Sequence, residues 1–157
     1  MTREALQTKI LELLPAATFD EAADTNTNGW PIINVAPANW PVLARHLYFN
    51  ETLHFDFLFC LTCVDWKTHL GMVYHLTSTL HRHNIVVKAK LNNDTPEIES
   101  VSSIWQTANF HEREVYEMFG VQFIHHPDLR LLILPDGWEG RNPLRKDFED
   151  PVNMIRL

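Results

Sequence analysis

Histidines are the side chains of this sequence that most directly suggest metal chemistry, with nine among 157 residues. His81 and His83 are two positions apart, and His125 and His126 are adjacent. His111 precedes a glutamate, but no second histidine stands four residues after it, so the HExxH zinc motif is absent. A catalytic zinc site needs three protein ligands in tetrahedral geometry. Because no compact spacing supplies that set, a stand-alone metal hydrolase remains only an alternative interpretation.

The two cysteines, Cys60 and Cys63, form a CxxC pattern. In redox proteins this pattern opens a helix, whose N-terminus lowers the thiol pKa. Here both cysteines lie in the apolar run 55–64, which predicts a strand, and residues three apart on a strand face opposite sides. Two cysteines are also too few for an iron–sulfur cluster, which takes four protein ligands. We therefore interpret them as small residues of a strand.

Motifs that bind nucleotides or activate a nucleophile are missing. The sequence contains no GxGxxG, no GxxxxGKS/T and no GxSxG pattern, and it has only 5 glycines. A hydrophobic fraction of 45% and a charged fraction of 21% are typical of one soluble domain. The net charge of -7 argues against nucleic-acid binding. The N-terminus lacks the apolar stretch of a signal peptide, so we expect a cytoplasmic location.

One carboxylate, Glu112, falls on the apolar side of a predicted helix. The helix spans 103–119 and ends at Gly120. At about 100° per residue, Glu112 lies on the stripe between Ala108 and Val115. A buried carboxylate is costly unless it is paired, so a cationic or backbone-donor partner is expected. Acid–base catalysis is open to such a group, but we favour a structural ion pair. The candidate cations after the helix are Arg130, Arg141, Arg145 and Lys146.

The segment after Gly120 is rich in apolar groups but irregular. It holds four of the nine prolines, and residues 121–124 and 129–134 are expected as short strands. Disordered tails are poorer in large apolar side chains, so this segment needs a surface, either of its own domain or of a partner. We therefore predict a core domain of residues 1–120 and an extended partner-binding tail of residues 121–157.

The rest of the sequence predicts an α+β fold. Hydrophobic periodicity indicates helices over 2–14 and from a capping Asn39, and strands over 30–35, 53–66, 70–80 and 84–91. Pro31 lacks an amide donor, which favours a strand start or an edge strand. The run 53–66 is apolar on both faces and is expected at the centre of the sheet. Short polar connections predict an antiparallel meander. The expected architecture is a two-layer domain, with an antiparallel or mixed sheet packed by helices and an extended C-terminal tail.

Four motifs late in the sequence share a resemblance to one family. They are Glu112–Gly120 (EREVYEMFG), His126–Arg130 (HPDLR), Leu134–Gly140 (LPDGWEG) and Pro143–Phe148 (PLRKDF). In this order they resemble the 30 kDa, or C-type, subunit family of respiratory complex I, the proton-pumping NADH:quinone oxidoreductase. The sequence departs from the usual family pattern at Glu117, His125 and Leu131, where aspartate, glycine and a second arginine are usual.

The resemblance implies a non-catalytic structural and assembly subunit of the hydrophilic, peripheral arm of that complex. It implies no cofactor on this chain, with the flavin and iron–sulfur clusters on partner subunits. The implied partner is the D-type subunit, also called the 49 kDa type, with the cluster-bearing B-type and I-type subunits nearby. Membrane association would come through the complex. The expected location is the cytoplasmic face of a bacterial inner membrane, or the matrix side in a mitochondrion.

The resemblance also implies roles for individual residues, none of them catalytic or metal-binding. Glu112 and Arg113 are expected to tie the helix to the tail, with Glu117 beside Arg113 on a polar flank. The tail residues expected to hold the partner are Arg130, Trp138, Glu139, Arg145, Lys146 and Asp147. The alternative is the homologous subunit of a related machine, such as an energy-converting hydrogenase or formate hydrogenlyase complex.

Overall fold

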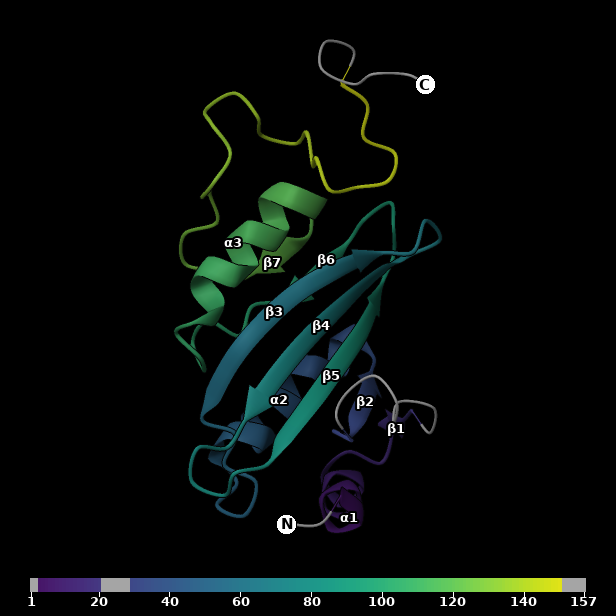
Figure 1. Cartoon of the computed structure of the whole chain (residues 1–157), viewed down its shortest axis with the longest axis vertical. Coiled ribbons are helices and arrows are strands. Elements are labelled where there is room, and N and C mark those ends of the chain that lie inside the picture. The colour runs from purple at the N-terminus through teal and green to yellow at the C-terminus, as the bar shows by residue number, and fades with distance from the viewer. Residues whose placement is uncertain (1–2, 21–28, 151–157) are drawn as a thin grey trace.

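A computed structural model of the chain describes residues 3–20 and 29–150. Its main sheet contains the strands β1 (Thr18–Phe19), β2 (Ile32–Val35), β3 (Phe57–Asp65), β4 (Leu70–Thr77) and β5 (Asn84–Leu91). They lie in the order β1-β2-β5-β4-β3 (Figure 1). Strands β3, β4 and β5 form the predicted antiparallel meander, whereas β2 runs parallel to β5. The sheet is therefore mixed.

Three α-helices accompany the sheet among the described residues. They are α1 (Arg3–Leu13), α2 (Trp40–Phe49) and α3 (Ala108–Phe119), and a 3-10 helix η2 (Pro37–Asn39) leads into α2. Helix α2 lies behind the sheet and α3 lies beside β3 (Figure 1). Trp40 of α2 packs on Tyr74 of β4 with ring centroids 4.4 Å apart. This arrangement confirms the predicted two-layer α+β class.

The sequence predicted where β2 and α2 begin, after Pro31 and Asn39 respectively. Strand β2 begins directly after Pro31 and lies inside the sheet, so the strand start is the correct alternative of the two. Asn39 occupies the position before α2 as predicted, but its side chain makes no capping hydrogen bond. Its backbone is already helical because it closes η2. Residue 2, at which the first predicted helix begins, lies outside the described residues.

Strand β3 lies at the edge of the sheet, so its predicted central position was wrong. Its inward side chains, Leu58, Leu61 and Cys63, are buried, while Phe57 and Phe59 on the other face are exposed. An apolar run shows that both faces can pack, but it does not show what lies beside the strand. The free edge of β3 is met instead by the segment that leads into α3.

Helix α3 begins at Ala108, five residues later than predicted from Ser103. The residues before it form turns that bind this segment to the beginning of β3. The Trp105 indole Nε1–H donates to the carbonyl of Phe55 at 2.8 Å. The Thr107 hydroxyl donates to the carbonyl of Leu58 at 2.8 Å. These bonds replace regular helix at this end and cover part of the edge of β3.

A second, two-stranded sheet lies beside α3. It pairs β6 (Glu97–Glu99) in parallel with β7 (Gln122–Ile124). Strand β7 agrees with the expected strand over 121–124, whereas β6 was not predicted. Residues 129–134 form no strand, so that expectation was wrong. Among the described residues, no helix combines the length and apolar character needed to cross a membrane.

Candidate functional site

The face of α3 that turns toward the tail carries two buried charges, Arg113 and Glu117. The Arg113 guanidinium donates from Nε to the carbonyl of Arg130 at 3.1 Å and from Nη2 to the carbonyl of Leu131 at 2.7 Å. Glu117 accepts hydrogen bonds from the next three backbone amides, those of residues 132–134, at 2.8 to 3.1 Å. One helix face therefore binds two carbonyls and three amides of the tail, which belong to four consecutive peptide groups.

The flank of α3 that carries Arg113 and Glu117 is buried against the tail. Arg113 is 7% exposed and Glu117 is 1% exposed. A buried charge is tolerated where hydrogen bonds and an opposite charge replace water. The tail supplies carbonyl oxygens to the cation and amide hydrogens to the anion. The four-residue spacing places both groups on the same side of α3, so they act on adjacent peptide groups.

Glu112 lies on the adjoining face of α3 and is fully buried. Its carboxylate accepts from the Ser100 hydroxyl at 2.6 Å and from the Val101 amide at 2.8 Å. The expected backbone donor is therefore present. The four candidate cations of the tail make no hydrogen bond or ion pair with Glu112 in the described structure. The carboxylate instead joins α3 to the segment that follows β6.

His126 is the tail group nearest to this carboxylate. Its Nε2 lies 3.7 Å from Glu112 Oε2, and both side chains are fully buried. The Asp128 amide donates to Nδ1 at 3.0 Å, which places the ring proton on Nε2, where it donates to the carbonyl of Asn109 at 3.2 Å. Burial lowers the pKa of His126, so this geometry corresponds to the neutral ring.

The environment of Glu112 favours the protonated carboxyl group. Burial raises its pKa to about 7, against the hydrogen bonds from Ser100 and Val101, which lower it. The charge of Glu99 raises it further. A carboxyl group with this pKa would suit acid–base chemistry, but it is enclosed by the packing of α3. Its contacts connect three segments of the chain, as a structural group does.

The far end of the tail is bound at the end of β3. Asp65, buried at the last position of β3, accepts from the Lys146 amide at 2.8 Å and from the Lys67 amide at 2.6 Å. These bonds lower the pKa of Asp65, so it stays ionised. The Arg145 guanidinium donates to the carbonyl and side-chain oxygens of Asn93, each at 3.1 Å. The tail thus crosses from α3 to the sheet.

Gly120 allows the tail to pass close to the end of α3. It ends the helix with φ of +79°, and a Cβ atom there would lie 2.7 Å from Nδ2 of Asn142. We expect Gly120→Ala to destabilise the protein more than Gly137→Ala. Gly137 also has a positive φ, of +86°, but nothing lies within 4 Å of its Cβ position. The control should cost about 1–2 kcal/mol of left-handed strain. Urea unfolding of both variants measures the difference, and equal losses would contradict the close approach.

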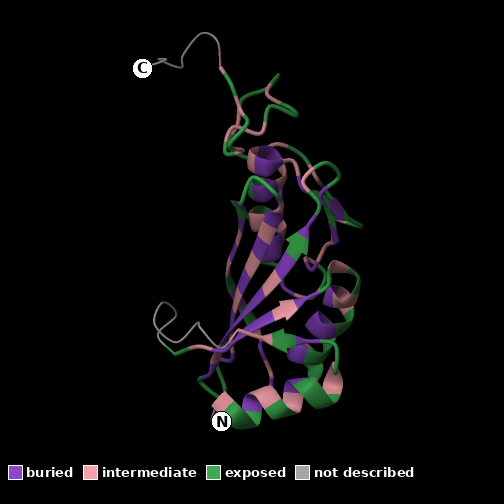
Figure 2. Ribbon diagram, turned by 90° about the vertical axis from the view of Figure 1, so that its right-hand side faces the viewer, coloured by how far each residue is buried: buried purple, intermediate pink, exposed green. Residues whose placement is uncertain are grey.

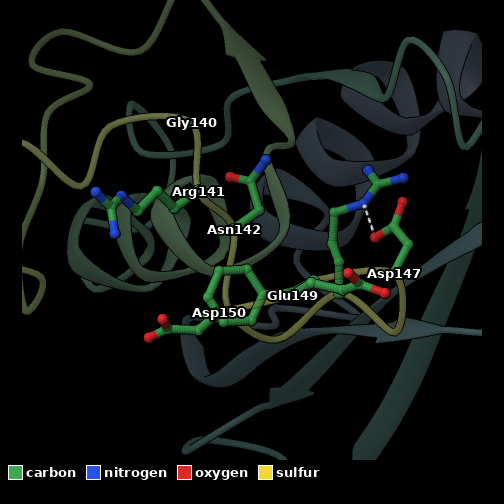
Figure 3. A pocket seen from close by; sticks show the side chains of 8 residues that line it. Gly140, Arg141, Asn142, Asp147, Glu149 and Asp150 are labelled. Atoms are coloured by element: carbon green, nitrogen blue, oxygen red, sulfur yellow. Dashed lines mark hydrogen bonds and ion pairs between the residues drawn. The ribbon is translucent and has the colours of Figure 1, made fainter. Parts of the chain in front are cut away.

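The other predicted tail residues lie nearer to solvent. Arg130 is exposed and pairs with Asp128 at 2.8 Å. Trp138 is half-buried, and the Arg141 guanidinium lies 4.7 Å from its ring centroid. Glu139, Lys146 and Asp147 are exposed. Arg145 and Asp147 form an ion pair at 3.3 Å beside an open cavity of about 610 Å³ in the tail (Figure 3). The side chains around it carry both signs of charge.

The sites considered for metal or redox chemistry do not assemble in the described residues. No group of three histidine, cysteine, aspartate or glutamate side chains there is placed to hold a metal ion. Cys60 and Cys63 are free thiols on β3. Burial raises the pKa of Cys63 to about 12 and also raises that of Cys60. Such thiols are poor nucleophiles at neutral pH.

Sequence reasoning missed three partners of the tail and of α3: Asp65, Asn93 and Ser100. Asp65 left a usable signal, because it follows the inward positions of an apolar strand, where a charged residue requires a partner. Asn93 and Ser100 had no comparable signal in the sequence. Asn93 accepts two hydrogen bonds from Arg145 and Ser100 donates one to Glu112, and the geometry of these bonds depends on how distant segments pack.

The fold and these contacts define a small α+β domain whose buried charges bind its own C-terminal coil. The family model described as "Respiratory-chain NADH dehydrogenase, 30 Kd subunit" matches residues 33–152. The protein belongs to this family. The match contains the sheet strands β2 to β5, helix α3 and the described tail up to Asp150.

Individual relatives come from more than one kind of respiratory enzyme. The C/D subunit of NADH-quinone oxidoreductase from Phocaeicola vulgatus is 51% identical over 71% of this chain and 22% of its own length. The C-type subunit of F(420)H(2) dehydrogenase from Methanosarcina mazei is 45% identical over 65% of this chain and 66% of its own length. The present sequence therefore spans less than two thirds of both proteins.

A solved structure extends the likeness beyond the family match. One polypeptide of the membrane-bound sulfane sulfur reductase, an archaeal respiratory membrane complex, has a TM-score of 0.79 at 26% identity. The alignment covers 93% of this protein and 85% of that polypeptide. The shared structure thus includes the tail as well as the sheet and helices.

Proposed function

We propose that this protein is a non-catalytic structural and assembly subunit of the peripheral arm of a proton-translocating NADH:quinone oxidoreductase. Electron transfer from NADH to quinone would occur on other subunits, which carry the flavin and the iron–sulfur clusters. The family match over residues 33–152 supports the assignment of this protein to that complex. The observation that carries the structural role is the buried Arg113–Glu117 pair, whose hydrogen bonds all go to backbone groups of the tail.

The proposed partner is the D-type subunit, of the 49 kDa type, with the B-type and I-type subunits nearby. The Phocaeicola vulgatus relative is named as a combined C/D subunit, which supports a close association of the two types. The proposal keeps residues 1–120 as the core domain and 121–157 as the partner-binding tail. The half-buried Trp138 and four exposed side chains of this tail would meet the partner: Arg130, Glu139, Lys146 and Asp147. The complex would lie on the cytoplasmic face of the membrane, or on the matrix side in a mitochondrion.

Replacing Arg145 by alanine should lower the amount of assembled complex rather than the turnover of each assembled copy. The guanidinium bonds to Asn93 and to the carbonyl of Phe119, so its loss loosens the tail without touching a reaction centre. Complex content and NADH oxidation per complex should be measured in membranes. Arg45→Ala, at an exposed position of α2, serves as the control. Normal complex content with slow turnover per complex would contradict the structural role.

A second candidate is the homologous subunit of a machine that uses another electron donor. The F(420)H(2) dehydrogenase relative and the sulfane sulfur reductase structure favour this candidate specifically. Purification from membranes through a tag on this protein distinguishes the two. Copurified NADH-dependent quinone reduction supports the first proposal. Activity with hydrogen, formate or another donor, together with the corresponding subunits, supports the second.

A further inference from the structure

His126 is a buried histidine of the tail, and the neutral form of its ring uses both ring nitrogens. Figure 2 shows the tail at the end of the molecule opposite α1, next to α3. The Nε2–H group of His126 donates to the carbonyl of Asn109 at 3.2 Å, and Nδ1 accepts from the Asp128 amide at 3.0 Å. The side chain is 0% exposed. A proton on Nδ1 would point at the Asp128 N–H group, so the ring cannot become charged without losing this hydrogen bond.

The hydrogen bond to Nδ1 closes a turn at the beginning of the irregular part of the tail. We name residues 126–130 the tail turn. The His126 amide donates to the carbonyl of Phe123 in β7 at 3.3 Å, and the Arg130 side chain donates to the Asp128 carboxylate at 2.8 Å. The carbonyl of Arg130 accepts from Arg113 at 3.1 Å. The tail turn therefore connects β7 to the part of the tail that α3 binds.

Three elements place charged groups around the His126 ring. They are Glu112 and Arg113 of α3, Asp128 of the tail turn, and Glu99 of β6, which acts on the ring through Glu112. Burial lowers the pKa of His126 and Arg113 lowers it further, against the Asn109 carbonyl and Asp128, which raise it. Glu112 lies 3.7 Å from Nε2, but burial raises the pKa of Glu112 to about 7. Below that pH its carboxyl group is neutral and supplies no counter-charge to the ring.

We propose that His126 is a pH-sensitive switch that closes the tail turn while its ring is neutral and releases the turn when Nδ1 binds a proton from solvent. The hydrogen bond from the Asp128 amide to Nδ1 breaks in this step, and the Arg113 guanidinium repels the imidazolium that forms. Residues 132–134 stay bound, because their amides donate to Glu117 and not to a histidine. The switch goes beyond the proposed function, because it requires no partner subunit.

The released turn gains population as pH falls. A ring whose pKa is lowered in the closed turn binds fewer protons there than in the released turn. Closing is therefore fully favoured above the ordinary histidine pKa of 6.5 and weakens as pH falls below it. Between pH 7.5 and pH 5 the equilibrium should shift toward the released turn by about tenfold to thirtyfold.

Amide hydrogen exchange of the purified protein tests the switch. The protection of the His126 and Asp128 amides, taken relative to that of residues 132–134 in the same sample, should fall by that factor from pH 7.5 to pH 5. In His126→Asn, the side-chain Oδ1 still accepts from the amide two residues later, as in an Asx-turn, and does not titrate. This variant should keep the same ratio at both pH values. His125→Asn removes the adjacent histidine, whose side chain is 79% exposed, and should keep the wild-type response.

A constant ratio in the wild type would overturn the inference, as would a fall that persists in His126→Asn or disappears in His125→Asn. Ring-nitrogen NMR shifts of the wild-type protein give a second measurement that needs no variant. They should place the ring proton on Nε2 at pH 7.5 and show a titration midpoint below 6.5. A ring proton on Nδ1 at pH 7.5, or an imidazolium paired with Glu112, would refute the closed turn as its neutral state.

Discussion

Replacing Glu117 by alanine is expected to lower the free energy of unfolding by about 3–5 kcal/mol, because three tail amides lose a buried, charged hydrogen-bond acceptor. The carboxylate accepts hydrogen bonds from the amides of Leu132, Ile133 and Leu134. Without it, these amides lose their acceptor. The buried guanidinium of Arg113 then lacks the opposite charge that stands four residues away on the same helix face. The effect should therefore exceed that of three ordinary surface hydrogen bonds.

Urea unfolding of the purified protein measures this loss, and hydrogen exchange locates it. The amides of residues 132–134 should exchange faster in Glu117→Ala. The control is Glu114→Ala, which removes an exposed carboxylate from the same helix and should change stability by less than about 0.5 kcal/mol. If exchange at residues 132–134 stays as slow as in the wild type, the Arg113–Glu117 pair is not what holds the tail.

The regular elements were largely predictable because their signals are local. Gly120 ends α3 in the left-handed conformation, as its position after an apolar helical pattern indicates. The meander follows from three apolar runs with short polar connections, which leave little choice of topology. The edge position of β3 and the existence of β6 were not predictable in this way. They depend on the segments around Trp105 and Phe123, which come from elsewhere in the sequence.

The candidate site was predicted by residue type but not by pairing. Periodicity correctly placed Glu112 in the interior and required a partner, and the observed donors are Ser100 and Val101 rather than the candidate cations of the tail. It placed Arg113 and Glu117 together on a polar flank but did not indicate that this flank is buried. They are buried because an irregular segment of the tail supplies backbone carbonyls and amides as hydrogen-bond partners. Such a segment has no hydrophobic periodicity from which its position could be predicted. Every non-proline residue has the same backbone amide and carbonyl, so the sequence does not indicate which of them will bind a buried charge.

Replacing Glu112 by glutamine is expected to make the stability of the protein less sensitive to pH between about 4.5 and 7. Burial raises the pKa of this carboxyl group from 4.5 to about 7. The folded protein therefore holds a proton that the unfolded protein has released, and stability falls as pH rises from 4.5 through 7. Between pH 5 and pH 8 the wild type should lose about 2–3 kcal/mol that the glutamine variant keeps.

Urea unfolding of both proteins at pH 5 and pH 8 measures this difference. His126 and Glu99 lie near the carboxyl group, but they are present in both proteins, so their direct contributions largely cancel. The glutamine Oε1 can still accept from the Val101 amide, and its NH2 group can donate to the Ser100 hydroxyl oxygen, which keeps the variant folded. If the wild type and the variant have parallel pH profiles, Glu112 is ionised at neutral pH, and a cation close to it would be required after all. If the profiles diverge as pH rises from 5 to 8, buried Glu112 holds a proton in the folded protein, and the contacts between β6, α3 and the tail weaken as pH rises from about 4.5 to 7.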